Sequence, residues 1–340
     1  MNITEHQIIG HERLIEATDD TGFRALVAIH NTNLGVALGG CRVKSYSSYG
    51  EQLRDVLALS KGMTYKAALA GLPLGGGKAT INAPVADKDT LAKFAEVMDY
   101  INKDGVQYIT AGDVGTGPQE VALLARLTEF VNGQHLGEDS GYATAYGVYM
   151  AMMGALQFHN RDIRQQQLCI NGLGKVGMRL AKFTHREVKS LFVTDIDKQR
   201  MQDAMNLYQA TRVMHKDRLL QHATIYSPNA LGGDLDLGTL DLLTAGDIVC
   251  GGANNQFYDK EFDVAYAGKG VTVVPDYLAN AGGIIIVKEG MKDGSYRDPD
   301  VLEKLKGVMH TTIEVLERAR DEKHTPMFIA NKMAEERFNV

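Results

Sequence analysis

Two lysines with a glycine-rich stretch between them are the first residues of this sequence that could do chemistry. Lys66 and Lys78 stand twelve positions apart, and Gly71, Pro73 and a run of three glycines at 75–77 lie between them. Glycines leave the backbone uncovered, so a small ligand can touch the chain directly. One ammonium group can bind a small anion while the other acts on it. Two nearby ammonium groups also lower each other's pKa, which suits a lysine to proton transfer near neutral pH.

Two other interpretations of this stretch have to be weighed. A nucleotide-binding P-loop, G-x-x-x-x-G-K-[ST], would need glycine at Leu72 and serine or threonine at Ala79, so the pattern fails at both ends. A solvated turn without function remains open on this segment alone. The other motifs of the chain favour a site.

One carboxylate, Asp113, stands where a strand is expected to end. The β-rich stretch 106–110, VQYIT, runs directly into AGDVGTGP. In an α/β domain, ligands bind at the carboxyl ends of the strands. Asp113 could instead cap the helix expected over 118–130, but Thr116 is better placed for that role. We therefore interpret Asp113 as a functional residue.

The stretch CINGLGKVGM contains the pattern G-x-G-x-x-G at Gly172, Gly174 and Gly177. The pattern is weak alone, but here it follows an apolar strand, 168–171, and opens a helix, 178–185. In a dinucleotide-binding fold the first glycine makes the tight turn and the second lets the pyrophosphate approach. The third lets helix and strand pack, and the helix N-terminus attracts the phosphates.

An acidic residue completes this pattern. Asp195 ends the next strand, LFVTD, 23 positions after Gly172, which is close to the spacing of the acid that binds an adenosine ribose. Asp195 would repel a 2′-phosphate, and no arginine follows within four residues, so NAD is favoured over NADP.

Three later units, 223–233, 247–256 and 271–283, each predict a strand that ends in small or amide-bearing residues. Asn254 and Asn280 stand at these ends. Buried asparagines often only tie loops together, but two such turns at one crevice favour ligand contacts. The residues expected to contact the cofactor are Gly172, Gly174, Lys175, Val176, Gly177, Asp195, Ile196, Thr144, Ala253, Asn254 and Asn280.

The elements that position these residues alternate between strands and helices, with a shift to Gly, Ser and Thr over 131–148. Before that shift we expect strands over 22–30, 34–44, 79–83 and 106–110, and helices around 53–63 and over 89–103 and 118–130. After it we expect a helix over 144–160, the units above, and helices over 301–320 and 326–337. The sequence thus predicts an α/β fold of two domains with a cleft between them. Residues 1–139 form the domain that holds the two lysines and Asp113, residues 140–324 form a Rossmann-type domain, and the last helix, about 325–340, can return to the first.

Composition narrows the class of protein. The 340 residues are 44% hydrophobic and 23% charged with a formal charge of −6, which gives no reason to expect nucleic acid or a membrane as partner. Cys41, Cys169 and Cys250 lie far apart and are expected to be buried thiols in a reducing cytoplasm. The N-terminus is too polar for a signal peptide, no run reaches transmembrane length, and no histidine pair predicts a metal site.

Five motifs in order resemble the amino acid dehydrogenases of the glutamate/leucine/phenylalanine/valine type: KGMTYKAALAGLPLGGGKA, AGDVGTG, GLGKVG, GGANNQ and PDYLANAGG. The likeness is strongest to the leucine dehydrogenase branch and covers both expected domains. It implies an N-terminal domain that carries the substrate and a Rossmann domain that carries a nicotinamide cofactor. The implied reaction is reversible: an L-amino acid, NAD and water give a 2-oxo acid, NADH and ammonium.

The resemblance also implies roles for single residues. Lys66 corresponds to the lysine that holds the substrate α-carboxylate. Lys78 corresponds to the lysine that activates water and stabilises charge on the carbonyl oxygen. Asp113 corresponds to the acid and base that exchanges protons with the amine. Hydride transfer to the nicotinamide needs a dry site and therefore closure of the cleft.

Substrate choice depends on two further positions. Family members that use glutamate carry a lysine near the glycine pair of a G-G-x-R stretch and a serine after a later A-G-G turn. Leu38 and Val287 stand there in this chain. Apolar side chains cannot offset the desolvation of a distal carboxylate, so glutamate should be a poor substrate. The residues expected to contact the substrate are Lys66, Leu38, Gly39, Gly40, Ile284, Val287 and Asn254.

The chain departs from the leucine enzymes in several places. Gly112 replaces a glutamate, a D-P-S-P segment is replaced by EDSGYAT, and the chain stops soon after MAEERFNV. Because of these departures, phenylalanine or tryptophan remains an alternative to leucine, valine and isoleucine as the preferred substrate. The departures also favour a homodimer over an octamer. A non-catalytic protein that senses NADH is a remote alternative, because all three reactive residues are present.

Overall fold

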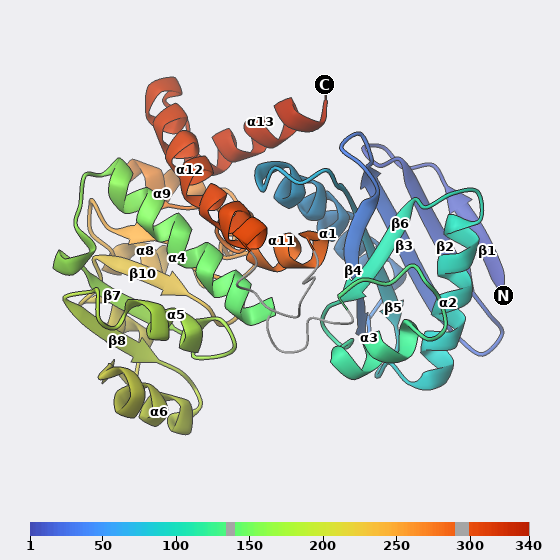
Figure 1. Cartoon of the computed structure of the whole chain (residues 1–340), viewed down its shortest axis with the longest axis horizontal. Helices are drawn as coiled ribbons and strands as arrows, with labels where there is room; N and C mark the ends of the chain where they lie inside the picture. The colour runs from blue at the N-terminus through green and yellow to red at the C-terminus, as the bar shows by residue number, and fades with distance from the viewer. Residues whose placement is uncertain (134–139, 290–298, 340) are drawn as a thin grey trace. The chain divides into compact units, whose positions relative to one another are not determined.

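The computed structural model of the chain describes residues 1–133, 140–289 and 299–339 (Figure 1). Within this part the chain forms two compact units. The first comprises residues 1–133 and 334–339, and the second comprises residues 140–289 and 299–333. The domain boundary expected between residues 139 and 140 falls at the edge of a stretch outside the described residues.

The first unit is built on a six-stranded mixed sheet. Its elements are β1 (Asn2–His6), β2 (Arg13–Thr18), β3 (Arg24–Asn31), β4 (Ala37–Lys44), α1 (Tyr49–Leu69), β5 (Gly75–Asn82), α2 (Lys88–Asn102), β6 (Tyr108–Gly112) and α3 (Pro118–Leu124). The strand order is β1-β2-β3-β5-β4-β6. β4 runs parallel to β5 and β6, whereas β1, β2, β3 and β5 pair antiparallel. Because β5, β4 and β6 are parallel, their carboxyl ends meet at one edge of the sheet.

Helices cover both faces of this sheet because its strands alternate between two apolar sets. Leu26 and Ala28 of β3 pack with Val56 of α1. Ala25 and Val27 of the same strand face the other way, into a core shared with α2 and α3. This core includes Leu91, Phe94, Val97, Met98, Ile101, Val121 and Leu124. The result is a sheet held between α1 on one side and α2 with α3 on the other.

The glycine run is part of a strand, so the expectation that the strand begins only at Ala79, after the glycines, was wrong. The three glycines open β5 and are buried. A Cβ added at Gly76 would lie 2.2 Å from the backbone nitrogen of Thr64 in α1, and one at Gly77 would lie 2.6 Å from the ring of Tyr108. The missing side chains therefore let α1 and β6 pack closely on β5. Gly71, with φ +64°, makes the turn that ends α1, as expected.

Other differences in this unit are local. β1 and β2 were not predicted from the sequence. The helix expected over 118–130 ends at Leu124, and its N-cap is Gly117, whose backbone N–H is bound by the Glu120 side chain at 2.8 Å. Thr116 is therefore not the helix cap.

The second unit has a six-stranded sheet in which every pair is parallel. Its elements are α4 (Ser140–Phe158), η1 (Ile163–Gln165), β7 (Gln167–Asn171), α5 (Gly177–Thr184), β8 (Ser190–Thr194), α6 (Lys198–Tyr208), β9 (Thr211–Arg212), α7 (Lys216–Leu220), β10 (Ile225–Pro228), α8 (Leu237–Leu242), β11 (Ile248–Val249), α9 (Phe262–Gly268), β12 (Thr272–Val273), α10 (Asp276–Ala279), α11 (Gly282–Glu289) and α12 (Pro299–Glu322). α13 (Pro326–Phe338) begins in this unit and ends in the first. The strand order, β12-β11-β10-β7-β8-β9, reverses between β7 and β10, which is the Rossmann arrangement.

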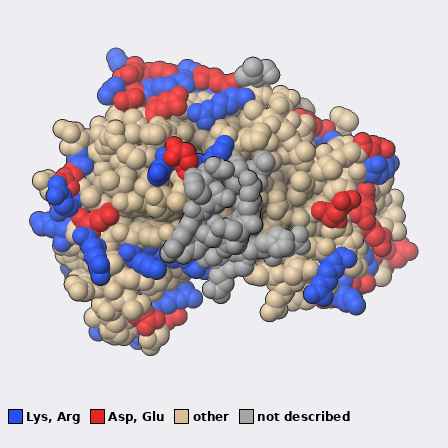
Figure 2. Space-filling model, in the orientation of Figure 1, with Lys and Arg blue, Asp and Glu red and all other residues tan. Residues whose placement is uncertain are grey.

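The predicted α/β class with two units and a Rossmann-type sheet is confirmed. The three cysteines are free thiols and buried. On the face shown in Figure 2, basic and acidic side chains are interspersed. Among the described residues no helix is both long and apolar enough to cross a membrane.

Candidate active site

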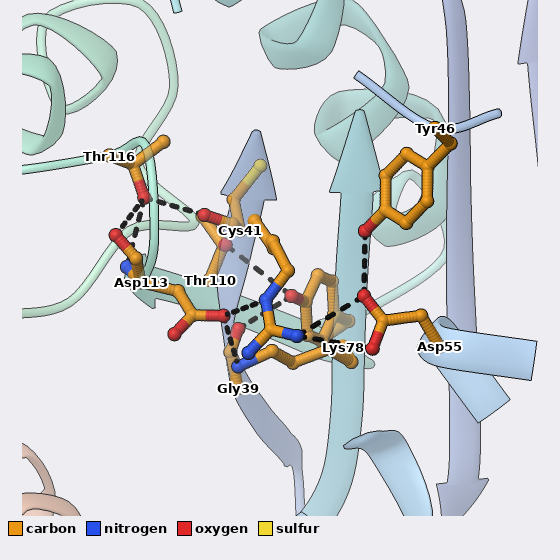
Figure 3. Close-up of polar contacts among 10 residues, drawn as sticks. Gly39, Cys41, Tyr46, Asp55, Lys78, Thr110, Asp113 and Thr116 are labelled. Atoms are coloured by element: carbon orange, nitrogen blue, oxygen red, sulfur yellow. Dashed lines mark hydrogen bonds and ion pairs between the residues drawn. The ribbon is translucent and has the colours of Figure 1, made fainter. Parts of the chain in front are cut away.

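Lys78 and Asp113 are brought together in the first unit, as an active site built from them requires. Lys78 lies on β5, and Asp113 directly follows β6. The Nζ atom of Lys78 is 2.9 Å from Oδ2 of Asp113, and the two side chains are 8% and 21% exposed (Figure 3). The pair is therefore largely shielded from water, where charge–charge interactions are strong.

Arg42 of β4 is a third charged residue of this cluster, and the sequence interpretation missed it. Its Nε lies 3.1 Å from Asp113 Oδ2, and its Nη1 lies 3.1 Å from Asp55 of α1. Tyr46 donates its hydroxyl proton to Asp55 at 2.7 Å. Arg42 is the arginine of the stretch GGCR, so the G-G-x-R pattern was a signal that could have found it.

These contacts control the ionisation of Asp113. Burial alone would raise the pKa of its carboxyl group, but the neighbouring Lys78 and Arg42 cations outweigh burial and hold that pKa below its usual value. Asp113 is thus a carboxylate near neutral pH and can accept a proton. Burial raises the pKa of the Cys41 thiol and of the Tyr108 hydroxyl, so both stay neutral beside it.

The turn after β6 orients the Asp113 side chain toward Lys78 and Arg42. The Oγ1 atom of Thr116 accepts a hydrogen bond from the Asp113 backbone N–H at 2.9 Å and donates one to the carbonyl of Cys41 at 2.5 Å. A Cβ added at Gly40 would lie 2.5 Å from the carbonyl oxygen of Gly112 and 2.9 Å from Asp113 Cβ. The absence of a side chain at Gly40 therefore lets Asp113 lean across β4.

Lys66 lies in the last turn of α1, on the helix that packs against the strand of Lys78. It stands three residues after Met63, and residues at this spacing share one face of a helix. A Cβ added at Gly39 would lie 3.2 Å from Met63 Cγ, so this face looks toward the middle of β4. Lys66 is half-buried there.

The expected substrate contacts in β4 are buried. Leu38 is 2% exposed. The carbonyl oxygen of Gly39 accepts a hydrogen bond from the hydroxyl of Tyr108 at 2.6 Å, and a Cβ at Gly39 would clash with the carbonyl of Gly77. The chain's own backbone therefore occupies the space that the glycine pair opens. Of the remaining expected substrate contacts, Ile284 and Val287 lie on α11 of the second unit.

The second unit has the geometry of a dinucleotide-binding turn after β7. Gly172 adopts φ +94°, and its Cβ would lie 2.7 Å from the backbone of Ala230 in the turn after β10. A Cβ at Gly177 would lie 1.9 Å from the carbonyl oxygen of Gly172, whereas Gly174 has nothing within 4 Å of its Cβ position. Gly174 and the exposed Lys175 thus border open space at the N-terminus of α5.

Asp195 lies next to this turn. Its Oδ2 accepts a hydrogen bond from the backbone N–H of Leu173 at 2.5 Å, and its Oδ1 accepts one from Asp197 N–H at 2.7 Å. The following residue, Ile196, is fully exposed. The carboxylate is therefore fixed beside the glycine turn, where a ribose hydroxyl could reach it.

Asparagines collect at the ends of the later strands. Asn280 donates its amide N–H to Asn254 Oδ1 at 2.8 Å. Asn280 Oδ1 is buried and accepts no hydrogen bond from any residue that the structure describes. A buried acceptor of this kind fits a ligand that donates an N–H, such as the carboxamide of a nicotinamide.

The other expected cofactor contacts line the same turns. The side chain of Val176 lies against the Cβ position of Gly252, and Ala253 N–H donates to the carbonyl of Pro228 at 3.1 Å. Thr144 of α4 lies against Gly283 at the start of α11. The residues at these turns fit a dinucleotide. Within the described ranges, no group of three His, Cys, Asp or Glu residues could hold a metal ion.

Comparisons with known proteins agree with this geometry. Residues 11–130 match the family described as Glu/Leu/Phe/Val dehydrogenase, dimerisation domain, and residues 187–338 match Glutamate/Leucine/Phenylalanine/Valine dehydrogenase. Leucine dehydrogenase of Bacillus subtilis is 35% identical over 335 residues, which cover 96% of this chain and 91% of that protein. Phenylalanine dehydrogenase of Bacillus thermotolerans is 36% identical over 343 residues, which cover 97% and 89%.

A solved structure extends the match to the fold. The crystal structure of L-tryptophan dehydrogenase from Nostoc punctiforme is similar with a TM-score of 0.85 and 32% identity, over 97% of this chain and 96% of that one. The resemblance inferred from the five motifs is thereby confirmed. The chain belongs to the Glu/Leu/Phe/Val family of amino acid dehydrogenases, oxidoreductases that act on CH–NH2 groups.

Proposed function

We propose that this enzyme catalyses the reversible, NAD-dependent oxidative deamination of a hydrophobic L-amino acid. The amino acid, NAD and water give the 2-oxo acid, NADH, ammonium and a proton. The observation that carries the proposal is the contact of 2.9 Å between Lys78 of β5 and Asp113, which follows the carboxyl end of β6. A lysine and a carboxylate in contact and shielded from water can pass protons to and from a substrate.

The residues divide the work. Lys66 binds the substrate α-carboxylate through its ammonium group. Lys78 orients the water that attacks the substrate and stabilises the oxygen charge that develops. Asp113 accepts a proton from the substrate amine and later returns it to the leaving ammonia. A nicotinamide, when bound, takes the hydride from the substrate Cα.

The proposed cofactor is NAD rather than NADP, and Asp195 is the residue that supports this choice. Its carboxylate is fixed beside the glycine turn by two backbone N–H groups. It can accept hydrogen bonds from ribose hydroxyls, and it would repel the 2′-phosphate of NADP. Lys175, at the N-terminus of α5, adds a positive charge near the expected phosphates.

The preferred substrates are leucine, valine and isoleucine. Leu38 supports this choice because it is apolar and almost fully buried. Ile284 and Val287 are also apolar, so none of the three can bind a distal carboxylate. Phenylalanine or tryptophan is the alternative, because relatives named for these substrates share 36% and 33% of the sequence. Size selection in apolar pockets is modest, about 1–3 kcal/mol per methylene.

The enzyme is proposed to act as a homo-oligomer, with a dimer favoured over an octamer. The match of residues 11–130 to a dimerisation domain supports association. Light scattering of the purified chain would give the number of copies directly.

The proposal is tested by measuring NADH formation at alkaline pH with Leu, Val, Ile, Phe, Trp and Glu as substrates. We expect turnover of the apolar amino acids and little turnover of glutamate. Repeating the assay with NADP should give much lower kcat/KM than with NAD. Glutamate turnover comparable with that of leucine would contradict the pocket argument.

A further inference from the structure

Arg42 lies between two carboxylates, one of which is Asp113. Its Nε is 3.1 Å from Asp113 Oδ2, and its Nη1 is 3.1 and 3.2 Å from the two carboxylate oxygens of Asp55. Asp55 is held in turn by the hydroxyl of Tyr46 at 2.7 Å. The Arg42 side chain is 20% exposed, so water screens its charge only in part. The guanidinium uses separate nitrogens for its two partners, which a lysine could not do.

Both cations of the cluster bind the same oxygen of Asp113. Lys78 Nζ lies 2.9 Å from Oδ2, the oxygen that Arg42 also contacts. Neither of these contacts involves Oδ1, and in Figure 3 the dashed lines from the Asp113 carboxylate start at one of its two oxygens. A carboxylate that exchanges protons with a substrate needs one oxygen turned toward it. The two cations therefore leave Asp113 one oxygen for this exchange.

The charges of the cluster balance. Arg42 and Lys78 carry two positive charges, and Asp55 and Asp113 carry two negative ones. Cys41, Tyr46 and Tyr108 also lie beside these four residues, and burial raises the pKa of each, so they stay neutral. Removing Arg42 would leave two carboxylates with one cation, whereas removing the charge of Asp55 would leave Arg42 to act on Asp113 alone.

We propose that Arg42 is a positioning residue of this dehydrogenase, which keeps Asp113 ionised and holds it by Oδ2 so that Oδ1 faces the substrate. The negative charge of Asp55 partly offsets that of Arg42 and so sets how strongly Arg42 stabilises the ionised form of Asp113. The inference deepens the proposed function, and it rests on that function for the role of Asp113 as acid and base.

Two variants with opposite effects test the proposal. Arg42→Gln removes the cation, so the pH at which Asp113 titrates should rise by roughly 1 to 3 pH units. The acid limb of the kcat/KM profile should move upward with it, because the active carboxylate is lost as pH falls through this value. Asp55→Asn keeps the shape of the side chain but removes its charge, so the same limb should move downward. A purely structural disturbance has no reason to shift the limb in opposite directions.

A third variant separates charge from geometry. Arg42→Lys keeps a positive charge but cannot contact both carboxylates through separate nitrogens. We expect it to return the acid limb toward the wild-type position while kcat stays at least several-fold lower. The KM for the amino acid should change less than kcat in all three variants, because Lys66 binds the substrate carboxylate.

The titration of Asp113 can also be followed without turnover. Carbon-13 NMR of the full-length protein labelled at aspartate carboxyl groups, with Asp113→Asn to assign the signal, reports its protonation directly. An upward shift in Arg42→Gln and a downward shift in Asp55→Asn support the proposal. Unchanged titration, or shifts of the same sign in both variants, overturn it. If the wild type turns over no amino acid but these NMR shifts occur, the proposed function fails while the control of Asp113 by Arg42 stands.

Discussion

Lys78 Nζ and Asp113 Oδ2 lie 2.9 Å apart although a whole strand, β4, separates the strands from which they come. The contact exists because Asp113 follows the end of β6 and leans back over β4, where Gly40 offers no side chain. Neighbouring parallel strands thus supply a lysine, a carboxylate and an arginine to one point. A reaction that needs both a proton acceptor and a cation is served by this arrangement.

Gly40→Ala should disrupt this contact. The new Cβ would lie 2.5 Å from a carbonyl oxygen and 2.9 Å from Asp113 Cβ, so the turn after β6 must move. We expect kcat to fall at least tenfold and the free energy of unfolding to fall by about 1–3 kcal/mol, as for other overpacked sites. Steady-state kinetics and urea unfolding measure the two effects.

Gly62→Ala is the matched control. Gly62 lies within α1, and nothing lies within 4 Å of its Cβ position. The substitution should leave kcat unchanged and stabilise the helix by up to about 1 kcal/mol. Equal losses of activity in both variants would contradict the role given to Gly40.

Changing the cofactor acid should change cofactor preference. In the double variant Asp195→Ser with Ile196→Arg, the repulsive carboxylate is removed and a guanidinium is added at a fully exposed position. We expect the KM for NAD to rise at least tenfold and that for NADP to fall, because arginine binds a 2′-phosphate. The ratio of kcat/KM values for the two cofactors is the measurement. An unchanged ratio would show that Asp195 does not contact the ribose.

Leu38→Lys should alter the substrate range. Leu38 is 2% exposed, so a lysine at this position is buried. Its positive charge is then stabilised only when a ligand brings a carboxylate to it. We expect leucine turnover to fall at least tenfold, glutamate turnover to appear, and stability without substrate to decrease. Leu38→Met, which keeps an apolar side chain of similar volume, should retain the wild-type preference. If Leu38→Lys has the same ratio of glutamate to leucine turnover as wild type, Leu38 does not contact the distal end of the substrate side chain.

His30 predicts that the protein loses stability in acid. Burial, with smaller effects from His11 and Lys61, lowers the pKa of His30 to about 4 from 6.5. Between these values the unfolded chain binds a proton that the folded chain does not. Stability from this group is therefore present above about pH 6.5 and is lost as pH falls toward 4.

The measurement is the melting temperature as a function of pH for wild type and His30→Gln. Glutamine can keep a hydrogen bond to Thr64 Oγ1, which lies 2.9 Å from His30 Nδ1, but it does not titrate. Between pH 6.5 and 4 the melting temperature of the variant should decrease less than that of wild type. Parallel curves would mean that His30 is not linked to folding in this range.

The sequence predicted the Rossmann unit well because its signals are local. The strand expected over 168–171, the glycine turn at Gly172 and Asp195 all lie between positions 168 and 195, and each has one structural meaning in that context. Lys78 and Asp113 could be predicted as site residues because glycines precede both of them. Lys78 follows Gly77 within β5, and Asp113 follows Gly112 at the end of β6. The resemblance to a family then supplied their roles.

The sequence could not predict what depends on distant contacts. The run 75–77 looks like a loop because glycines favour loops, but its backbone is packed against α1 and β6. Arg42 reaches Asp113 across 71 positions, so no local pattern shows their contact. β1 was missed because it is an edge strand with mostly exposed side chains, which carries little apolar periodicity.

The most direct test of the account compares wild type with Lys78→Gln, which removes the charge of the lysine that contacts Asp113. NADH formation from L-leucine and NADH affinity by fluorescence are measured on the same preparations. We predict that wild type turns over L-leucine and that kcat in the variant falls by roughly 100- to 1,000-fold, as for loss of a group that stabilises developing charge. NADH affinity should stay within about twofold, because Lys78 lies in the other unit from the glycine turn. A Lys78→Gln enzyme that turns over L-leucine as fast as wild type would contradict the central claim.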